Sequence, residues 1–382
     1  MKAEHVVLTG DTGDRAKVDH AAHVLAAGGL VAFATETVYG IGCMVSPEGF
    51  QRLDEAKGRP GDKRYTLHIA DPADAGKFVP LGDPRVRKLV NKAWPGPLTI
   101  VFEVDTSSQA RLRARWGDKI FPLLYEEGTV GLRCPDNAAA GALLRAAVGP
   151  VVAPSANLSG QAPATTAAEV LAQLDGRIDM VLDSDAWAPC RHKASSTVVR
   201  LGRGAPTTLR QGVVSIEQVI DAWTVRVLFV CTGNTCRSPM AAGLCRKILS
   251  ETLHCRLDEV EAMGYKIESA GTAGWGGAPA STEAVAVCGE YGVDIADHRS
   301  TSVSAEQLRR SDYVVVMGHG HRERVAQLCP EAAGECLLLD PQADIPDPIG
   351  QSVDEYRRCA EQIAAALKKR IDEIWHEGGG SK

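Results

Sequence analysis

The sequence predicts an α/β protein with two domains, and three observations support that fold class. The chain has 382 residues, which is more than one hydrophobic core usually organises. Continuous apolar runs, typical of buried strands, alternate with segments whose apolar residues recur every three or four positions, as they do in helices. The alternation starts afresh near residue 225, after a polar turn and one short helical segment. We therefore expect one domain over 1–214 and a second over 224–377.

The composition is that of a soluble protein, and we expect it in the cytoplasm. The formal net charge of −6 gives no overall attraction to nucleic acid or to an anionic membrane. Residues 1–15 are polar and lack the apolar core of a signal peptide, and the apolar stretch 21–34 is too short and interrupted to span a bilayer. The 11 cysteines show no regular spacing and no CxxC pair. We therefore expect reduced thiols, no disulfide framework and no metal site.

Local patterns predict several elements of the first domain. The apolar residues predict a helix over 21–27 and a buried strand over 30–33. A strand-like run over 196–201 lies near the end of the domain. A short helix follows it, and Ser215 and Gln218 have the spacing of a capping box at its start.

Two polar segments of the first domain have the composition of phosphate-binding loops. Lys57, Arg59 and Lys63 form a compact basic cluster, and the polar loop 155–160 follows a buried run over 151–153. Lysine, arginine and hydroxyl groups bind polyphosphates. Each segment taken alone is also typical of a solvated surface turn, so the residues by themselves leave both interpretations open.

The second domain begins with a strand, a loop and a helix. Residues 225–230 form a largely apolar run typical of a central parallel strand. The loop 231–238 follows, and Met240, Leu244 and Ile248 then recur at helical spacing. Strands that alternate with helices predict a doubly wound parallel sheet, whose ligands bind beyond the carboxyl ends of the strands.

The loop after that strand carries the strongest chemical signal in the sequence. A strand that continues through a loop into a helix directs backbone N–H groups and the positive end of the helix dipole to one point. Arg237 offers a planar fork that matches two phosphoryl oxygens, and the positive surroundings favour a thiolate at Cys231. We predict Cys231 as the nucleophile of a phosphatase and Arg237 as its phosphate clamp; the alternative is a structural cysteine on a tight turn. The residues expected to shape the phosphate-binding loop are Thr232, Gly233, Asn234, Thr235, Cys236 and Ser238.

Several motifs in order make this domain resemble the low-molecular-weight protein phosphatases. The resemblance covers 225–375 and is carried by 231–239, 269–272, 297–300, 311–317 and 347–350. It implies a flavodoxin-like sheet, a cysteinyl-phosphate intermediate that water hydrolyses, a phosphorylated protein as substrate and no cofactor. The aspartate of an Asp-Pro pair protonates the leaving group in this family, and that role falls on Asp347. Asp340 also precedes a proline, but Gly350 and the position before the last helix favour Asp347.

Two residues differ from those usual in the phosphotyrosine-directed members of the family, and they bear on which phosphorylated side chain is the substrate. Thr235 stands where a bulky aliphatic residue is usual, and Ile349 stands where an aromatic residue is usual. Thr235, together with His319 and His321, is more similar to the bacterial protein-arginine phosphatases. Trp275 would still offer a wall for a phenyl ring. The resemblance therefore favours phosphoarginine over phosphotyrosine by a small margin.

The cysteines of the second domain allow two other interpretations. Arsenate reductases of the same fold use two further cysteines in a disulfide relay, and Cys329 and Cys336 invite that comparison. The first relay cysteine would fall at Gly318, so arsenate reduction is not expected. Cys236 would protect Cys231 through a reversible disulfide under oxidation, or would simply pack.

The first domain resembles the YrdC-like threonylcarbamoyl-AMP synthases when its motifs are taken together. The match spans 21–212, and its motifs are 35–42, 57–60, 94–99, 130–133, 155–160, 196–199 and 209–212. It implies an open, twisted α/β sheet with a large, positively lined cavity. The implied reaction joins threonine, bicarbonate or carbon dioxide, and ATP, and it releases pyrophosphate. The implied partners are the tRNA-modification machinery that receives threonylcarbamoyl-AMP and, through a weak contact, the tRNA.

By the same match, basic residues would hold the nucleotide phosphates as pyrophosphate leaves. ATP would bring a divalent ion, Mg²⁺, although no protein ligand set for a metal is recognisable. No general base is recognisable either, so catalysis would rest on positioning and electrostatics. The residues expected at the phosphates are Lys57, Arg59, Lys63 and Arg210. Those expected at the adenylate are Ser155 and Asn157, with Ser196 nearby, and those expected at threonine or the carbamoyl group are Thr35 and Arg133.

Three departures from the synthase pattern leave a second function open. Ala34, Tyr65 and Gln211 stand where the family usually has proline. None of them removes a charged residue, so the sequence favours a bifunctional protein, a synthase-like domain fused to a phosphatase. The alternative is an active phosphatase fused to a non-catalytic module that binds nucleotide or tRNA.

Overall fold

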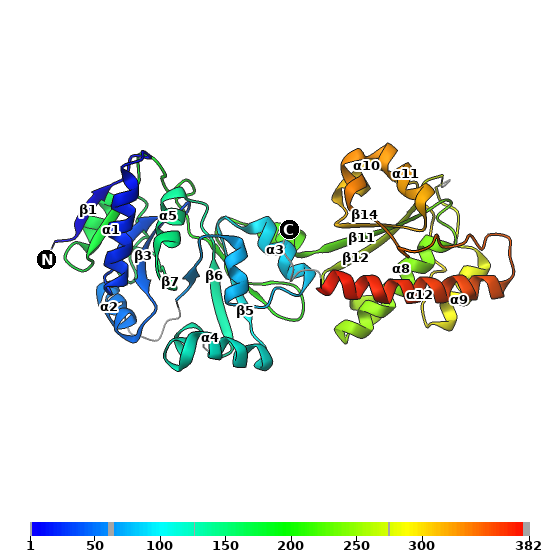
Figure 1. Cartoon of the computed structure of the whole chain (residues 1–382), viewed down its shortest axis with the longest axis horizontal. Coiled ribbons are helices and arrows are strands. Elements are labelled where there is room, and N and C mark those ends of the chain that lie inside the picture. The colour runs from blue at the N-terminus through cyan, green and yellow to red at the C-terminus, as the bar shows by residue number, and fades with distance from the viewer. Residues whose placement is uncertain (1, 60–64, 126, 274–275, 377–382) are drawn as a thin grey trace. The chain divides into compact units, whose positions relative to one another are not determined.

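The computed structural model describes residues 2–59, 65–125, 127–273 and 276–376, with backbone alone at 333, 335 and 374–376. The chain separates into two compact units (Figure 1). The first comprises Met1–Leu81 and Val86–Ala222, and the second comprises Gly82–Arg85 and Trp223–Lys382. Lys63 and Trp275, both named in the sequence predictions, lie outside the described residues. Within the ranges above, no helix combines the length and the apolar character that a membrane crossing requires.

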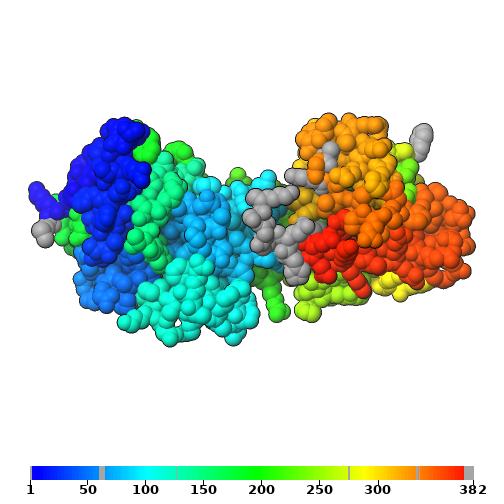
Figure 2. All heavy atoms as spheres, viewed as in Figure 1, coloured from blue at the N-terminus to red at the C-terminus, as the bar shows by residue number. Residues whose placement is uncertain are grey.

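The first unit is built on one mixed sheet with helices along it. Its strands are β1 (Glu4–Val7), β2 (Val31–Ala34), β3 (Tyr39–Met44), β4 (Leu67–His68), β5 (Leu98–Glu103), β6 (Thr129–Arg133), β7 (Val151–Val152), β8 (Met180–Asp183), β9 (Thr197–Leu201) and β10 (Thr207–Arg210). Its helices are α1 (Asp14–Ala26), α2 (Pro47–Lys57), the 3₁₀ helix η1 (Pro72–Lys77), α3 (Pro84–Ala93), α4 (Thr106–Leu124), α5 (Ala138–Ala146), α6 (Ala167–Leu174) and α7 (Ile216–Trp223). Figure 2 shows α1 and α4 on the outer surface of this unit.

The order of strands in this sheet brings distant parts of the sequence together. Among the described residues the order is β1-β8-β2-β3-β7-β4-β6-β5-β9-β10. β2 and β3 are antiparallel, whereas β5 runs antiparallel to β6 and parallel to β9. Segments far apart in the sequence, such as β3 and β7, are therefore neighbours near the centre of the sheet. The open α/β sheet expected for this unit is confirmed.

Two local predictions for the first unit differ in their accuracy. The capping box at α7 is confirmed, because the Gln218 backbone N–H donates to Ser215 Oγ and the Gln218 side chain accepts from the Ser215 N–H. The helix expected over 21–27 instead begins at Asp14. Its first turns are polar, and Val18 is their buried apolar residue, so the apolar pattern there is weak.

The second unit contains a parallel sheet covered by helices. Its strands are β11 (Val225–Cys231), β12 (Tyr265–Gly271), β13 (Tyr313–Val316) and β14 (Cys336–Leu338). Its helices are α8 (Arg237–Leu253), η2 (Leu257–Glu259), α9 (Thr282–Glu290), α10 (Ala305–Arg310), α11 (His319–Leu328), η3 (Pro330–Glu335) and α12 (Val353–His376). In the described residues the strand order is β12-β11-β13-β14, and each neighbouring pair is parallel.

Helices cover both faces of this sheet, which confirms the flavodoxin-like prediction (Figure 1). On one face, Phe229 of β11 packs in a cluster with residues of α8, α9 and α12, among them Met240 and Ile363. On the other face, Leu228 and Val230 pack in a cluster with residues of α10 and α11. A strand buried on both sides explains why β11 reads as a nearly continuous apolar run.

The end of β11 sets the position of the phosphate-binding loop. Cys231 is its last residue and lies in register with Gly271 of β12. A Cβ atom at Gly271 would lie 2.6 Å from the Thr232 carbonyl oxygen, so the close approach of the loop requires glycine there. The chain then enters α8 at Arg237.

Candidate active sites

Cys231 lies at the carboxyl end of β11 and is 2% exposed. Its Sγ atom lies 3.0 Å from the Ser238 hydroxyl oxygen, and the Asn234 backbone N–H donates to Sγ across 3.2 Å. The sulfur that would attack phosphorus thus has a hydroxyl and a backbone amide within hydrogen-bond distance. Because α8 begins just beyond, the positive end of its dipole acts on the same point.

Asn234 holds the loop in shape. It is fully buried and has a left-handed backbone with φ +56°, a conformation that asparagine tolerates better than most residues. Its side-chain nitrogen donates to Ser238 Oγ and Ser269 Oγ, each across 2.9 Å, and its side-chain oxygen accepts from the Thr301 N–H across 2.8 Å. His298 Nε2 lies 2.7 Å from its backbone oxygen. The loop that carries the nucleophile is therefore fixed by hydrogen bonds on several sides.

Arg237 and Asp347 meet beside this loop. The Arg237 guanidinium is buried and donates to the Ile345 carbonyl oxygen across 3.0 Å and to Thr232 Oγ1 across 3.3 Å. It also pairs with the partly exposed Asp347 carboxylate. Asp340, the other aspartate before a proline, accepts a hydrogen bond from the Gln342 backbone N–H in its own turn. The geometry thus brings Asp347 to the predicted clamp.

Cys236 is surrounded by hydroxyl groups. Its Sγ lies 3.2 Å from the Tyr356 hydroxyl, 3.4 Å from Ser281 Oγ and 3.6 Å from Thr235 Oγ1. Burial, together with the hydrogen bond to Cys236, raises the pKa of Tyr356 to about 12. These contacts fit a packing role for Cys236, and its disulfide with Cys231 stays a prediction.

Two histidines near the loop have different surroundings. His321 Nε2 lies 2.9 Å from Thr232 Oγ1, whereas His319 Nδ1 lies 2.7 Å from Asp344 Oδ1. Burial, and secondly the charge of Arg237, lower the pKa of His321. Sequence reasoning used both histidines as markers of a subfamily and gave neither a contact in the site.

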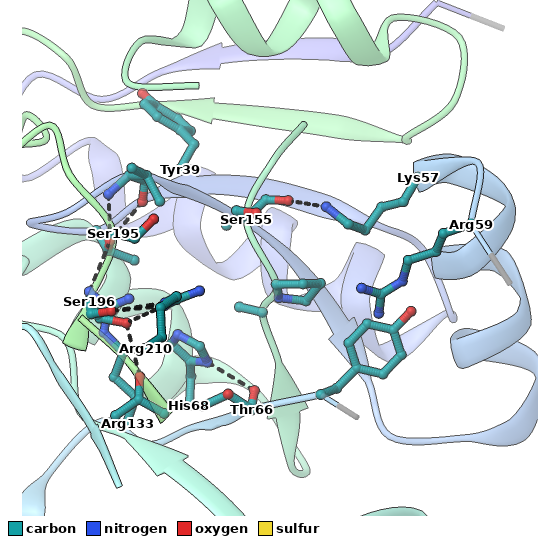
Figure 3. A pocket seen from close by; sticks show the side chains of 17 residues that line it. Tyr39, Lys57, Arg59, Thr66, His68, Arg133, Ser155, Ser195, Ser196 and Arg210 are labelled. Atoms are coloured by element: carbon teal, nitrogen blue, oxygen red, sulfur yellow. Dashed lines mark hydrogen bonds between the residues drawn. The ribbon is translucent and has the colours of Figure 1, made fainter. Parts of the chain in front are cut away.

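The first unit contains a polar cavity of about 210 Å³. Seven of the predicted ligand residues line it: Thr35, Lys57, Arg59, Arg133, Ser155, Ser196 and Arg210. Figure 3 shows Lys57 and Arg59 on one side of the cavity and Arg133 and Arg210 on the other. Lining side chains that sequence reasoning did not select include Tyr39, Tyr65, Thr66, His68, Thr99 and Ser195.

The two arginines on the second side differ in how their charge is balanced. Arg133 forms a buried ion pair with Glu36, with Nη2 and Oε1 2.7 Å apart, and also donates to Thr35 Oγ1 across 3.3 Å. Arg210 donates to the Ser196 carbonyl oxygen across 2.9 Å. Burial, and secondly the like charge of Arg133, lower the pKa of Arg210. An anion bound here would relieve that repulsion.

Lys57 supports the loop that contains Ser155 and Asn157. The buried Lys57 ammonium donates to the Ser155 and Asn157 carbonyl oxygens across 2.5 and 2.9 Å. The Asn157 side chain accepts from Ser155 Oγ and donates to the Leu158 and Gln161 carbonyl oxygens. Asn157 is not among the residues that line the cavity, and its amide forms hydrogen bonds within the loop; its contact with the adenylate stays a prediction.

Arg59 is held beside the cavity by Asp54 and Tyr65. Its Nε donates to Asp54 Oδ1 across 3.1 Å, and the Tyr65 hydroxyl donates to the same oxygen. The guanidinium carbon lies 4.5 Å from the centre of the Tyr65 ring, within cation–π range. Tyr65, which stands where the family usually has proline, thus supports a cationic residue of the site.

His68 of β4 is a buried hydrogen-bond acceptor in this cavity. Its Nδ1 lies 3.1 Å from the Thr66 carbonyl oxygen, and its Nε2 has no partner among the described residues. Burial, and secondly Arg133, lower the pKa of His68 to about 3. The neutral ring therefore carries its proton on Nδ1, where it donates to Thr66, and leaves a lone pair on Nε2. No sequence motif marks this single histidine, so its role follows from the fold alone.

The depressed pKa of His68 makes the stability of the first unit depend on pH. The unfolded chain takes up a proton at His68 near pH 6.5, whereas the folded chain does so near pH 3. Well above pH 6.5, His68 therefore does not change the free energy of unfolding. Between about pH 6.5 and pH 3, it lowers that free energy by about 1.4 kcal/mol for each pH unit of acidification. We expect the unfolding midpoint of the His68→Gln variant to vary less between pH 6.5 and 4.5 in calorimetry. The exposed His23→Gln variant serves as a control, and an equal slope in all three proteins would contradict this assignment.

Comparison with known families agrees with the two units. A family model described as "Telomere recombination", for Sua5, yciO and yrdC proteins, matches residues 23–212. A second model, described as "Low molecular weight phosphotyrosine protein phosphatase", matches residues 226–378. The two matches together cover most of both units.

Individual relatives align with one half of the chain each. The "Threonylcarbamoyl-AMP synthase" of Bacillus subtilis is 34% identical over 205 residues, which are 53% of this chain and 55% of that protein. The chain thus spans about half the length of that relative. The "Putative threonylcarbamoyl-AMP synthase" of Mycobacterium tuberculosis is 34% identical over 196 residues. These residues are 51% of this chain and 83% of that protein. The "Protein-arginine-phosphatase" of Geobacillus stearothermophilus is 32% identical over 157 residues, 40% of this chain and 97% of that protein.

The first match thus covers the unit that contains the cationic cavity, and the second covers the unit that contains the Cys231 loop. The chain belongs to the Sua5/yciO/yrdC family through residues 23–212 and to the low-molecular-weight phosphatase family through residues 226–378.

Proposed function

We propose that the second unit is a phosphoprotein phosphatase with Cys231 as its nucleophile. The observation that carries the proposal is the buried Cys231 thiol at a helix N-terminus, with the Ser238 hydroxyl oxygen 3.0 Å from its sulfur and the Asn234 N–H donating to it. Arg237 and Asp347 lie beside the same loop. A nucleophile, an anion-binding loop and a proton donor are the groups that phosphoryl transfer through a covalent intermediate requires.

The roles of the residues follow from their chemistry. The Cys231 thiolate attacks phosphorus while Asp347 gives its proton to the departing nitrogen or oxygen, so that a cysteinyl phosphate forms. The guanidinium of Arg237 and the backbone N–H groups of the loop balance the negative charge on the phosphoryl oxygens. The Asp347 carboxylate then accepts a proton from water, which attacks the cysteinyl phosphate and releases inorganic phosphate and the thiolate.

We further propose phosphoarginine as the substrate side chain, ahead of phosphotyrosine. A guanidinium offers several N–H donors, which a small hydroxyl such as Thr235 accepts, whereas a phenyl ring is better held by apolar or aromatic walls. Ile349, after the Asp-Pro pair, is 62% exposed and offers no aromatic face. The likeness to a protein named protein-arginine-phosphatase adds support. The test compares kcat/KM for two otherwise identical peptides, one phosphorylated on arginine and one on tyrosine; a higher value for phosphotyrosine would overturn the preference.

For the first unit, we propose synthesis of threonylcarbamoyl-AMP from ATP, threonine and bicarbonate or carbon dioxide. The observation that carries the proposal is the cavity with cationic side chains on two sides (Figure 3). Arg59 and Arg210 both line it, and their guanidinium groups suit the phosphates of ATP. The lone pair on His68 Nε2 suits an N–H or O–H donor, and threonine carries both an ammonium and a hydroxyl group.

ATP enters this reaction as a substrate and commonly carries Mg²⁺. Among the described residues, those that line the cavity include no carboxylate, the protein ligand that Mg²⁺ prefers. The ATP phosphates would bind the ion, and we assign no step to it. The tRNA-modification machinery would receive the product.

The experiment that tests the synthase is release of pyrophosphate by the purified chain. Release that requires ATP, threonine and bicarbonate together is the expected result. No release, from a preparation that cleaves an aryl phosphate, would overturn the synthase proposal and favour a non-catalytic module that binds nucleotide or tRNA.

Replacing Lys57 by alanine should slow that release by about 10- to 100-fold. The substitution leaves two carbonyl acceptors of the 155–157 loop without their charged donor, and a lost charged hydrogen bond typically costs about 1.5–3 kcal/mol. Turnover of an aryl phosphate by the second unit should not change. The exposed Lys119→Ala variant is the matched control. A Lys57→Ala protein that keeps full pyrophosphate release would show that this loop is not part of the site.

A further inference from the structure

We propose that His321 is a positioning residue of the phosphatase site: its Nε2 accepts the Thr232 hydroxyl proton and thereby keeps the Thr232 oxygen available to Arg237. The inference rests on the phosphatase function proposed above. It assigns a specific contact to a histidine of α11 that is far in sequence from the phosphate-binding loop.

Thr232 Oγ1 lies within hydrogen-bond distance of two side chains. Arg237 Nη2 lies 3.3 Å from this oxygen and His321 Nε2 lies 2.9 Å from it. A guanidinium has donors only, so the oxygen must accept from Arg237. The single hydroxyl proton is then free to point at His321, and Nε2 accepts it only if that nitrogen carries a lone pair.

The arrangement needs the neutral tautomer of His321, with the ring proton on Nδ1 and a lone pair on Nε2. Its Nδ1 is buried and has no protein partner among the described residues. The charged groups facing the ring are Arg237 of α8 and, from the segment before α12, Asp344 and Asp347. Burial and Arg237 outweigh the two carboxylates and lower the pKa of His321, so the ring is neutral at pH 7. If the Thr232 hydroxyl proton points at Nε2, the single proton of the neutral ring must be on Nδ1.

Protonation of His321 would reverse the hydrogen bond. A charged imidazolium donates from Nε2, so Thr232 Oγ1 would face two donors and its own proton would turn away from the ring. A second positive charge would also lie near Arg237. The positioning effect is therefore expected at neutral pH and lost in acid.

Steady-state hydrolysis of p-nitrophenyl phosphate by the full chain tests this idea. At pH 7.5, His321→Leu should lower kcat/KM by about tenfold, in the range expected for one oriented hydrogen bond. His321→Gln, whose side-chain oxygen can replace Nε2 as an acceptor, should recover most of that loss. Thr232→Val should cause a similar loss, and the double variant Thr232→Val/His321→Leu should lose no more than either single variant. Thr252→Val, which removes an exposed hydroxyl bonded within α8, is the control.

The pH profile separates positioning from a merely structural effect. The ratio of wild-type to His321→Leu kcat/KM should fall towards one in acid, below pH 6.5, because the lowered pKa of His321 places its protonation there and a protonated His321 no longer accepts. A ratio that is the same at every pH, or a His321→Gln variant as slow as His321→Leu, would overturn the inference. Failure of the phosphatase proposal itself would look different: the wild-type chain would show no turnover, or the Cys231→Ser chain would retain it.

Discussion

The Cys231→Ser variant should lose turnover of p-nitrophenyl phosphate by on the order of 10⁴-fold or more, since the attacking atom is gone. The serine hydroxyl fits the same hydrogen bonds to Ser238 and Asn234, so the loop should keep its shape. A hydroxyl is far less acidic than a thiol, and the helix dipole and loop donors do not generate an alkoxide at neutral pH. Turnover is measured by nitrophenol release, and the protein fold by its unfolding midpoint.

A second cysteine provides the matched control for this substitution. Cys255 is only partly buried and lies outside the loop, so Cys255→Ser should keep normal turnover. Pyrophosphate release by the first unit should be unchanged in both variants. Turnover that survives in Cys231→Ser would show that another group attacks phosphorus.

Asp347→Asn should slow phosphatase turnover by about 10²- to 10⁴-fold when the leaving group is strongly basic. An amide cannot supply the proton that such a leaving group needs. With a weakly basic leaving group, such as p-nitrophenolate, the loss should be smaller, because less proton transfer is required in the transition state. The measurement is kcat/KM across a series of aryl phosphates, and a steeper dependence on leaving-group pKa is the expected signature.

Asp340→Asn is the natural control, because both aspartates precede a proline. Asp340 accepts a backbone hydrogen bond in its own turn, whereas Asp347 pairs with Arg237. The Asp340 variant should therefore keep both its rate and its dependence on the leaving group. If the two variants exchanged these behaviours, the proton donor would be Asp340.

The phosphate-binding loop could be predicted from sequence because its parts are contiguous. A buried strand, a short loop and a helix fix where Cys231 and Arg237 point without any knowledge of distant residues. His321 could not be placed in the same way. Its contact with Thr232 depends on how α11 packs against β13 and β14, and no local pattern records that packing.

The residues that line the cavity of the first unit were harder to predict from the sequence, because they come from segments spread over most of the unit. Motif matching found the charged residues, but His68 stands alone in its strand and has no motif. Asn157 is the converse case, a residue that a motif selects but that is not among those lining the cavity. It belongs to a matched motif, yet its amide is used to hold the loop, and only the hydrogen bonds reveal this.

The carbonyl contacts of Lys57 and Arg210 bear on how the first unit would bind an anion. Both side chains are long and would each lose substantial rotamer freedom if a ligand had to collect them from solvent. Here the Ser155 and Ser196 carbonyl oxygens already restrain them, so that entropic cost falls on folding of the chain rather than on ligand association. Such a preorganised cavity should bind triphosphates with little rearrangement of its walls, and its selectivity should come from the fixed spacing of its cations.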